Sequence, residues 1–387
     1  MLSADSAAIV RATLPVVGAS LDAITTRFYE TMFAERPELL DGLFNRGNQA
    51  NGEQRRALAG SIAAFATWLL EHPDERPDEL LARIAHKHTA VGVTDDQYTI
   101  VHKYLFGAIA HVLGEAVTPE VAAAWDEVYG LMAGALIAQE ARIYAEVGAC
   151  NGATWRQWRV TARQEEAPDV VSFLLRPADD GPVPPARPGQ YVSVRVRMPD
   201  GVHQLRQYTL SSAGDLRRIT VKRVRGVPDG EVSTLLHETV RPGDELALSA
   251  PFGDVALDDG DAPLVLVSAG IGGTPIVAML EHLAATGSRR RVLLLHADRS
   301  PAEHALREDM RHLAPERTFW YETGATALDR DGRMDLDGVE IPEGAIAYLC
   351  GPVPFMRDVR TQLLKSGVAA RDIHYEVFGP DLWLAAD

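Results

Sequence analysis

The spacing of apolar residues changes twice along the chain. Up to about Ala145, apolar positions recur every three to four residues, which is typical of amphipathic helices. From Trp155 to Glu245, apolar and polar residues alternate with a period near two, which indicates strands with one solvated face. From Pro263 onward, short apolar strands alternate with helical segments. The pattern predicts three domains in order: an all-α domain, an antiparallel β-barrel and an α/β domain.

The expected boundaries follow from local composition. The first domain spans residues 1–147, and the small and polar residues 148–154 form a linker. The barrel spans residues 155–258. After the acidic turn Asp258-Asp259-Gly260-Asp261, the α/β domain spans residues 262–387.

Four polar side chains interrupt the apolar faces of the predicted helices. His88 follows Leu81 on one face, Gln54 lies one turn before a second apolar stripe, Glu140 stands within a third, and Tyr29 is a fourth candidate. A lone histidine on such a face is more often a core residue than a metal ligand. A buried carboxylate needs a hydrogen-bond donor, such as a tyrosine hydroxyl or an imidazole N–H. The pattern alone leaves both interpretations of His88 open.

Two segments in the later domains combine a strand with polar or glycine-rich residues. In the barrel, Gln190–Arg197 alternates cleanly and predicts a strand, and Arg206–Ser211 by itself is equally compatible with an exposed barrel strand. In the last domain, the apolar run Leu264–Ala269 predicts a buried parallel strand, followed by Gly270–Pro275 and a helix over Ile276–Leu283. Such a loop lets backbone amides approach a phosphate at a helix N-terminus, but a tight turn has the same composition.

Composition narrows the classes of function. The chain has 387 residues and a formal net charge of −16, which argues against nonspecific nucleic-acid binding. No apolar run approaches the roughly 18 residues that cross a bilayer, and Met1–Asp5 does not begin a signal peptide. The two cysteines, Cys150 and Cys350, are too few for a disulfide framework. We expect a cytoplasmic protein without a transmembrane segment.

Short motifs along the chain resemble those of a known family. The first domain resembles, in order and spacing, the globin domain of bacterial flavohemoglobins. Arg206–Ser211 resembles the flavin signature of the ferredoxin-reductase superfamily, and Gly270–Pro275 resembles that superfamily's dinucleotide loop. The resemblance covers essentially the whole chain and implies a ferredoxin-reductase-like arrangement after the globin. The globin motifs are Phe28-Tyr29, Pro37-Glu38-Leu39, Leu43-Phe44-Asn45, Asn48-Gln49, Gln54-Arg55, Lys87-His88-Thr89 and Gln97-Tyr98.

The resemblance implies a heme b site in the first domain. His88 matches the proximal ligand of the iron. Tyr98 and Glu140 match residues that hydrogen-bond the other ring nitrogen, which raises the basicity of the imidazole. On the distal side, Tyr29 and Gln54 match the pair that donates hydrogen bonds to the oxygen ligand.

Three further residues match positions around the heme. Phe44 matches the phenylalanine that wedges the heme, and Leu58 matches the apolar residue that limits distal space. Lys87 matches a residue at the boundary between heme and flavin. A solvated surface lysine is an equally good interpretation of Lys87.

The resemblance also implies an FAD site and a nicotinamide site. Arg206 would supply a cation for the pyrophosphate, Tyr208 an aromatic face for the isoalloxazine, and Thr209 a hydroxyl near its reactive nitrogen. Gln207 belongs to the same motif, and Tyr191 matches a further flavin contact. The remaining expected cofactor-binding residues are Gly230, Val232 and Ser233 at a helix N-terminus; Gly270, Ile271, Gly272, Gly273, Thr274 and Pro275; Cys350, Gly351 and Pro352; and the C-terminal Glu376, Val377, Phe378, Gly379 and Pro380.

The activity implied by the resemblance is that of a nitric oxide dioxygenase. NAD(P)H would reduce FAD, the flavin would pass single electrons to heme, and O2 and NO would give nitrate. Asp298 disfavours a 2′-phosphate beside Arg299, so we expect NADH, with NADPH tolerated. The expected partners are these small molecules, with a lipid in the distal heme pocket as in some relatives, and no nucleic acid; the protein is expected to be a monomer.

Two alternatives remain open at this point. One is a heme protein that binds or senses O2 or NO and is kept ferrous by its own reductase. The other is a flavin reductase with an external acceptor and a heme-free helical domain. Detoxification and nitrosative signalling are equally compatible with the sequence.

Overall fold

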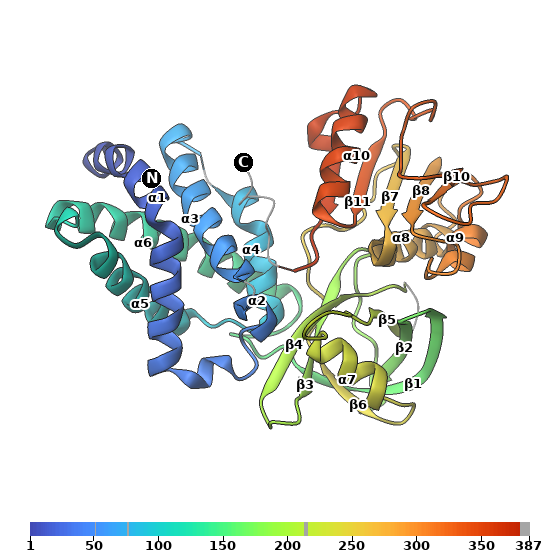
Figure 1. Ribbon diagram of the computed structural model, residues 1–387, viewed down its shortest axis with the longest axis horizontal. Coiled ribbons are helices and arrows are strands. Elements are labelled where there is room, and N and C mark those ends of the chain that lie inside the picture. Colours follow the sequence, from blue (N-terminus) through green and yellow to red (C-terminus); the bar gives the residue numbers. More distant parts are fainter. Residues whose placement is uncertain (51, 76, 213–215, 380–387) are drawn as a thin grey trace. The chain divides into compact units, whose positions relative to one another are not determined.

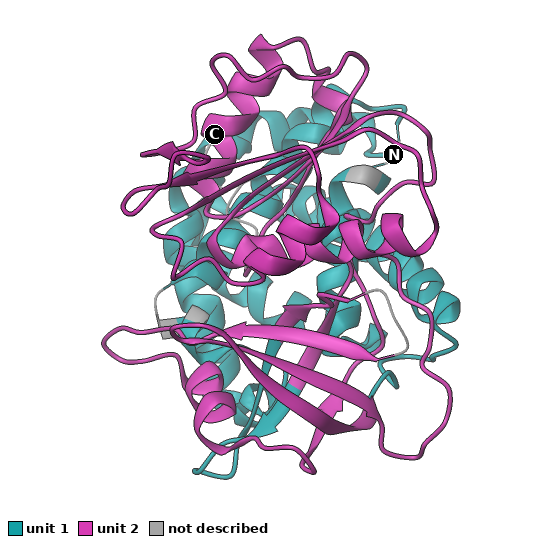
Figure 2. Ribbon diagram, turned by 90° about the vertical axis from the view of Figure 1, so that its right-hand side faces the viewer, with its two compact units in different colours: residues 1–155, 195–206, 380–387 teal, residues 156–194, 207–379 magenta. Residues whose placement is uncertain are grey.

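The computed structural model divides the chain into two compact units, which are coloured separately in Figure 2. The first unit contains residues 1–155 and 195–206, and the second contains residues 156–194 and 207–379. The expected site residue Pro380 and the side chain of Asn48 lie outside the described residues. The structure describes residues 1–50, 52–75, 77–212 and 216–379.

Helices form most of the first unit, as the apolar periodicity predicts (Figure 1). Helix α1 packs against α3, α5 and α6, and α4 packs against α6. The buried side chains on these helices include Ile24, Phe28, Phe65 and Leu81. The described elements are α1 (Ala4–Glu35), η1 (Pro37–Leu40), α2 (Arg46–Ala50), α3 (Glu53–Glu71), α4 (Asp78–Val91), α5 (Asp95–Leu113), η2 (Gly114–Ala116) and α6 (Pro119–Glu146).

The corner between α4 and α5 is fixed by local sequence. Gly92 ends α4 with φ of +86°, a left-handed conformation that glycine adopts without the cost of a Cβ, and its N–H donates to His88 O at 3.0 Å. Thr94 then begins α5 with a capping box that Gln97 completes. The two helices that carry His88 and Tyr98 are therefore joined by a short, well-defined turn.

Helices α1 and α6 correct one expectation from the sequence. Each contains an 18-residue window that is long and apolar enough to span a membrane, with mean hydropathies of 1.5 and 1.3. The expectation that no apolar run approaches this length is therefore wrong. Both helices pack within the helical unit, and α6 buries the polar side chains of Gln139 and Glu140. The core helices of a soluble protein pass the same test, so the two windows are weak evidence for a membrane span.

A hairpin of residues 195–206 belongs to the helical unit, although it lies between two barrel strands in the sequence. Asp41 accepts hydrogen bonds from the backbone N–H of His203 at 2.6 Å, and Gly42 N–H donates to His203 O at 3.0 Å. The backbone N–H of Arg46 donates to Oε1 of the buried Gln204 at 3.1 Å. The hydrogen bond from His203 N–H also holds the pKa of Asp41 below its usual range. Together these contacts connect the hairpin to the segment between α1 and α3.

The first sheet is antiparallel, as the period-two alternation predicts. Its strand order is β4-β3-β6-β1-β2-β5, and the β1–β2, β1–β6 and β2–β5 pairs are antiparallel. Residues 231–239 form α7 (Glu231–Thr239), which confirms the expected helix after Gly230. The strands are β1 (Arg156–Ala167), β2 (Val170–Pro177), β3 (Tyr191–Arg197), β4 (His203–Thr209), β5 (Arg217–Lys222) and β6 (Glu245–Leu248).

The second sheet is parallel, with the order β10-β9-β8-β7-β11-β12. The apolar run Leu264–Ala269 is β7 at its centre, as predicted. The other elements are β8 (Val292–Asp298), β9 (Arg317–Tyr321), β10 (Arg330–Asp331), β11 (Ile346–Cys350), β12 (Ile373–Glu376), η3 (Gly270–Gly272), α8 (Gly273–Ala285), α9 (Arg307–Leu313), α10 (Val353–Lys365) and η4 (Ala370–Asp372).

Helix α8 begins earlier than the sequence pattern suggests. The expected loop ended at Pro275, but Gly273, Thr274 and Pro275 already form the first turn of α8. Proline is tolerated there because its missing N–H has no partner within the helix. The helix N-terminus therefore lies directly after the short η3 turn.

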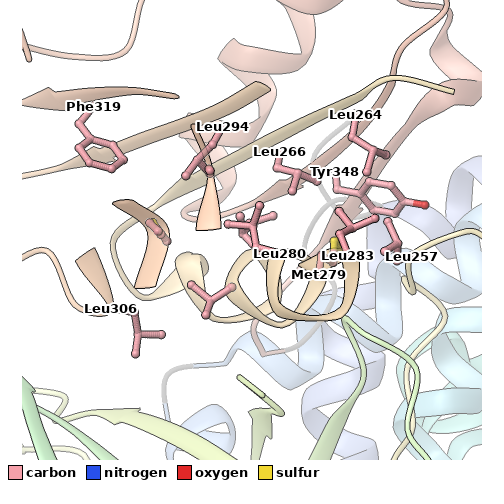
Figure 3. Packing of buried hydrophobic residues seen from close by; sticks show 14 of the residues in the cluster. Leu257, Leu264, Leu266, Met279, Leu280, Leu283, Leu294, Leu306, Phe319 and Tyr348 are labelled. Atoms are coloured by element: carbon pink, nitrogen blue, oxygen red, sulfur yellow. The ribbon is translucent and has the colours of Figure 1, made fainter. Parts of the chain in front are cut away.

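Side chains of α8 cover one face of the parallel sheet (Figure 3). Met279, Leu280 and Leu283 of α8 lie in one buried cluster with Leu264 and Leu266 of β7. Burying a side chain of this size stabilises the folded state by about 1.5–3 kcal/mol. This core holds the strand ends and the N-terminus of α8 in fixed positions.

Candidate functional site

The helical unit encloses a cavity of about 220 Å³. Tyr29, Gln54 and His88 line it together with Tyr98, so three of the four polar side chains that interrupt separate apolar stripes converge on one space. Most of the remaining lining is apolar and includes the expected Phe44 and Leu58. An apolar slot with one imidazole suits a flat, largely apolar group that carries a metal ion.

On one side of this cavity, His88 is held by two other helices. His88 Nδ1 lies 2.8 Å from Glu140 Oε1 on α6 and 3.0 Å from Tyr98 OH on α5. The Tyr98 hydroxyl donates to the same carboxylate oxygen at 2.5 Å. A carboxylate that accepts at Nδ1 keeps the proton on that nitrogen and leaves Nε2 with its lone pair available for a metal.

The burial of Glu140 is explained by this network. Its side chain is 4% exposed, and a carboxylate in such surroundings needs donors to compensate for lost hydration. Burial and the negative charge of Glu140 raise the pKa of Tyr98 far above its usual range, so the Tyr98 hydroxyl remains a donor. The sequence predicted that a buried Glu140 needs a hydrogen-bond donor, and the structure supplies two, His88 Nδ1–H and the Tyr98 hydroxyl.

Tyr29, which also lines the cavity, contacts two other aromatic side chains. The Tyr29 ring stacks on Phe33 at 5.6 Å and meets Phe44 edge-on at 6.1 Å. Burial raises the pKa of Tyr29 well above its usual value, while the Gln54 side chain opposes this as a hydrogen-bond partner. Gln54 in turn accepts from Gln49 Nε2 at 2.8 Å. Tyr29 and Gln54 therefore form a small polar group among apolar side chains.

Sequence reasoning did not single out Tyr129, and the expected residues Lys87 and Glu140 do not line the cavity. The hydroxyl of Tyr129 donates to the backbone carbonyl of Tyr98 at 2.6 Å, which anchors the first turn of α5. Tyr129 also lines the cavity, but it follows the stripe residue Val128 and carried no signal in the pattern. Lys87 is half-buried and is not among the residues that line the cavity.

The second unit contains two adjoining clefts. The first has a volume of about 730 Å³, and the second about 670 Å³. Lys222, Ile271, Arg299 and Phe378 line both of them. Residues from the antiparallel sheet and from the parallel sheet therefore face a continuous region within one compact unit.

The expected cofactor-binding residues divide between lining and supporting positions. The first cleft is lined by Gln207, Tyr208, Thr209, Thr274 and Phe378. The second is lined by Gly270, Ile271, Gly272, Gly351, Pro352, Val377 and Phe378. The other expected residues of this unit are not among the lining residues of either cleft: Tyr191, Gly230, Val232, Ser233, Gly273, Pro275, Cys350, Glu376 and Gly379. Arg206 falls in the helical unit.

Several supporting residues have clear structural positions. Ser233 Oγ accepts from Val224 N–H at 3.1 Å and so holds the loop before α7. Tyr191 is buried, and its ring would lie 3.3 Å from a Cβ added to Gly253. Burial, together with the charge of Glu376, raises the pKa of the Cys350 thiol well above its usual range, so this cysteine remains a neutral thiol.

Thr209 provides a test of whether the first cleft suits a polar ligand. Its side chain is 5% exposed, and among the described residues no group accepts from or donates to its buried Oγ1. A buried hydroxyl without a partner is costly unless a ligand supplies one. The cleft beside it also receives Lys222, Arg223, Arg225 and Arg299, which suits an anionic group such as a pyrophosphate.

A glycine turn forms one part of the second cleft. The Gly270–Gly272 turn lies against Cys350 and Gly351, so a Cβ on Gly272 would overlap Cys350 O and lie 2.9 Å from Gly351 N. Because the 13-residue helix α8 starts at Gly273, its first N–H groups point toward this turn. The arrangement suits the phosphates of a dinucleotide.

Comparisons with known proteins agree with these three sites. Residues 26–136 match the Globin family model, residues 157–256 the oxidoreductase FAD-binding domain, and residues 266–361 the oxidoreductase NAD-binding domain. This succession defines a class: oxidoreductases that join a heme-binding globin to an FAD- and NAD-dependent reductase.

Relatives along the full chain make the assignment more specific. The chain is 44% identical to a flavohemoprotein of Bordetella pertussis over 98% of this chain and 99% of the relative, and 42% identical to one of Chromobacterium violaceum over 98% of each. A crystal structure of flavohemoglobin from Malassezia yamatoensis with bound FAD and heme matches with a TM-score of 0.90 and 41% identity, covering 98% of this chain and 100% of that one. The chain belongs to the flavohemoprotein family.

A further solved structure covers the reductase part. The flavohem-like FAD/NAD-binding domain of nitric oxide dioxygenase from Vibrio cholerae is 39% identical, with a TM-score of 0.56, over 59% of this chain and 100% of that one. The expected all-α globin, antiparallel FAD-binding and α/β NAD-binding domains are thereby confirmed.

Proposed function

We propose that this protein is a nitric oxide dioxygenase that uses NAD(P)H, FAD and heme to convert O2 and NO to nitrate. The observation that carries the proposal is the network of His88, Tyr98 and Glu140 in the same chain as the two adjoining clefts. When bound, FAD would accept a hydride from the nicotinamide and supply single electrons, and heme iron would bind O2 for its reaction with NO.

On the proximal side, we propose that Glu140 and Tyr98 act through His88. Glu140 holds the proton at His88 Nδ1 and fixes the plane of the imidazole, while Tyr98 satisfies the same carboxylate oxygen. The partial negative charge at Nδ1 increases electron donation by Nε2. Strong donation favours activation of a ligand over its simple storage.

On the distal side, we assign the donor role to Tyr29 with Gln54. The raised pKa of Tyr29 keeps its hydroxyl protonated, so it can donate toward negative charge that develops on a ligand in the cavity. Phe44 and Leu58 would exclude water and confine the ligand. The apolar lining would also accept the acyl chain of a lipid, which we keep as a further candidate partner.

In the second unit, we assign the flavin to the first cleft and the nicotinamide nucleotide to the second. Thr209 Oγ1 would donate to a ring heteroatom of the flavin, and Tyr208 would offer an aromatic face. Lys222, which the sequence reasoning did not single out, lines both clefts and adds positive charge where the two meet. It is the last residue of β5, and the run Lys222-Arg223-Val224-Arg225 would have been its signal.

We propose NADH as the preferred reductant. Asp298 ends β8 at the second cleft, and its carboxylate accepts the backbone N–H of Arg299 at 2.8 Å. A carboxylate at this position suits the ribose hydroxyls and repels a 2′-phosphate. Arg299 also lines the cleft, but Glu303 pairs with its guanidinium.

The state of the two cysteines bears on where the protein acts in the cell. The two cysteines are not joined to each other, since Cys150 is exposed and Cys350 is buried and both are free. Free thiols fit a reducing compartment, so we propose that the enzyme acts in the cytoplasm, as a monomer that does not bind nucleic acid.

An anaerobic absorption spectrum before and after addition of NADH tests the proposal. We expect a Soret band with flavin absorbance, then conversion to ferrous heme on NADH addition, followed by consumption of many equivalents of NO per heme in air. His88→Ala is expected to lose the Soret band and to keep flavin reduction by NADH. A folded protein with flavin but no Soret band, despite heme supplied during expression, would indicate a reductase for an external acceptor. Binding of NO without turnover would indicate a sensor.

A further inference from the structure

Arg218 joins the two lobes of the second unit. The antiparallel lobe comprises residues 156–194 and 207–257, and the parallel lobe comprises residues 258–379. Arg218 lies on β5 of the antiparallel lobe, and its side chain is 13% exposed. It does not line either cleft. Its contacts in the structure are instead with other side chains and backbone of this unit.

One edge of the Arg218 guanidinium binds Ser211, two residues beyond the end of β4. Its Nε donates to the carbonyl oxygen of Ser211 at 3.0 Å and to Ser211 Oγ at 3.2 Å, and Nη2 donates to the same carbonyl. The backbone N–H of Ser211 returns a bond to Arg218 O at 2.8 Å. Ser211 follows Thr209 by two positions, and its Oγ lies 2.8 Å from Oγ1 of Thr220, which lines the first cleft.

The other edge binds two helices of the parallel lobe. Nη2 donates to Glu281 Oε1 on α8 at 2.8 Å, and Nη1 donates to Asp309 Oδ2 on α9 at 3.0 Å. Glu281 lies eight positions after Gly273 on α8, about 12 Å along a rigid helix whose N-terminus borders the second cleft. Met310, beside Asp309, supports that N-terminus, since its Cε would lie 2.6 Å from a Cβ on Gly273.

The charges make the contact dependent on arginine. Glu281 and Asp309 are 26% and 38% exposed, and without the guanidinium the two carboxylates would repel each other across a partly buried space. Three nitrogens of one planar group serve four acceptor atoms on three residues in fixed directions, which the single ammonium group of lysine cannot reproduce. The contact therefore specifies a relative position of β5, α8 and α9, in addition to holding them together.

We propose that Arg218 is a positioning residue for hydride transfer. It sets the distance between the end of β4, which carries Tyr208 and Thr209, and the Gly270–Gly272 turn. Arg218 acts through Ser211 on Tyr208 and Thr209 at the end of β4, and through α8 on the Gly270–Gly272 turn. This inference rests on the proposed assignment of FAD and NADH to the two clefts, and it does not depend on what the heme does with NO. Reaction rates fall steeply when two reactants are misplaced by about 1 Å. The second cleft is lined almost entirely by the parallel lobe, so its binding of NADH should be little affected.

Anaerobic stopped-flow reduction of the full-length holoenzyme by NADH tests the proposal. For Arg218→Gln we expect the limiting rate of flavin reduction to fall by about tenfold to a hundredfold, with the half-saturating NADH concentration changed by less than about twofold. The long-wavelength charge-transfer absorbance between reduced flavin and NAD+ is expected to weaken in parallel. Arg218→Lys should recover only part of the rate. If Arg218→Gln does not fold, Arg218→Lys and Asp309→Asn supply the same comparison.

Arg291→Gln is the matched control, because Arg291 forms an exposed pair with Glu316 at 2.6 Å that stays within the parallel lobe and does not join the two lobes. It is expected to leave the rate and the absorbance unchanged. Unchanged limiting rate and charge-transfer absorbance in both Arg218 variants would overturn the proposal, as would an equal loss in the Arg291 variant. Failure of the unmodified protein to bind FAD or to accept hydride from NADH would instead overturn the proposed function.

Discussion

The cavity of the helical unit and the glycine turn of the second cleft differ in which atoms supply the polar groups: side-chain atoms in the cavity and backbone atoms in the turn. In the cavity, side chains on separate helices supply the chemistry, and their backbones only carry them. In the cleft, the glycine turn offers backbone amides, and the absence of a side chain at Gly272 permits the turn to pack closely against Cys350 and Gly351. We therefore expect a conservative side-chain change in the cavity to alter its reactivity. We expect one added methyl group in the glycine turn to alter the packing of the cleft itself.

The largest effect is expected from Gly272→Ala. The new Cβ would overlap Cys350 O and approach Gly351 N, and neither backbone atom can move without displacing β11. We expect a loss of about 3 kcal/mol in the free energy of unfolding, at the upper end of overpacking costs, together with loss of NADH binding. Denaturant unfolding and calorimetric titration with NADH measure the two effects.

Gly270→Ala is the matched control within the same turn. No described atom lies within 4 Å of a Cβ at this position, so only the positive φ of +53° opposes the change. We expect a cost of about 1 kcal/mol. A Gly272 variant no less stable than the Gly270 variant would show that close backbone packing is not what this turn requires.

An intermediate effect is expected from Glu140→Gln in the cavity. The substitution keeps the shape of the side chain but removes the charge that faces His88 Nδ1 and accepts from Tyr98. Changes to groups that orient a metal ligand typically cost 10- to 100-fold in affinity, so we expect heme affinity to fall by about this factor with little change in fold. Transfer of heme to an apoglobin acceptor measures it. Glu146→Gln, at an exposed position on the same helix, should behave like the unmodified protein.

The smallest of these effects is expected from Tyr29→Phe. Loss of one hydrogen-bond donor is worth about 1.4 kcal/mol, so oxygen release from the reduced protein should accelerate by about tenfold. Since burial raises the pKa of Tyr29, the difference between the two proteins should be constant up to about pH 9. Flash photolysis over this range measures the rate. Tyr104→Phe, which loses a hydroxyl bonded to Glu35 outside the cavity, is the control, and an equal change in both variants would remove Tyr29 from its proposed role.

The same comparison explains what could be predicted from the sequence. The apolar stripes located His88, Gln54 and Glu140 because a polar residue on an apolar face is visible in the periodicity. The start of α8 at Gly273 was not visible, since a glycine-proline segment has the composition of a loop even where it forms a first helical turn. The Arg218 contact with Glu281 and Asp309 was also not visible, because it joins positions 63 and 91 residues apart and depends on tertiary packing alone.

The hairpin of residues 195–206 has a consequence for how this chain can be divided. Because the chain leaves the helical unit near Trp155 and returns to it for these residues, a cut at the linker separates the helices from a hairpin that they contact. A fragment that ends at residue 155 would lack the partners of Asp41, Gly42 and Arg46, and a fragment that begins there would carry a strand pair without its helical support. The two halves are thus interlaced along the polypeptide, and recombining this reductase with another globin would require exchange of the hairpin as well.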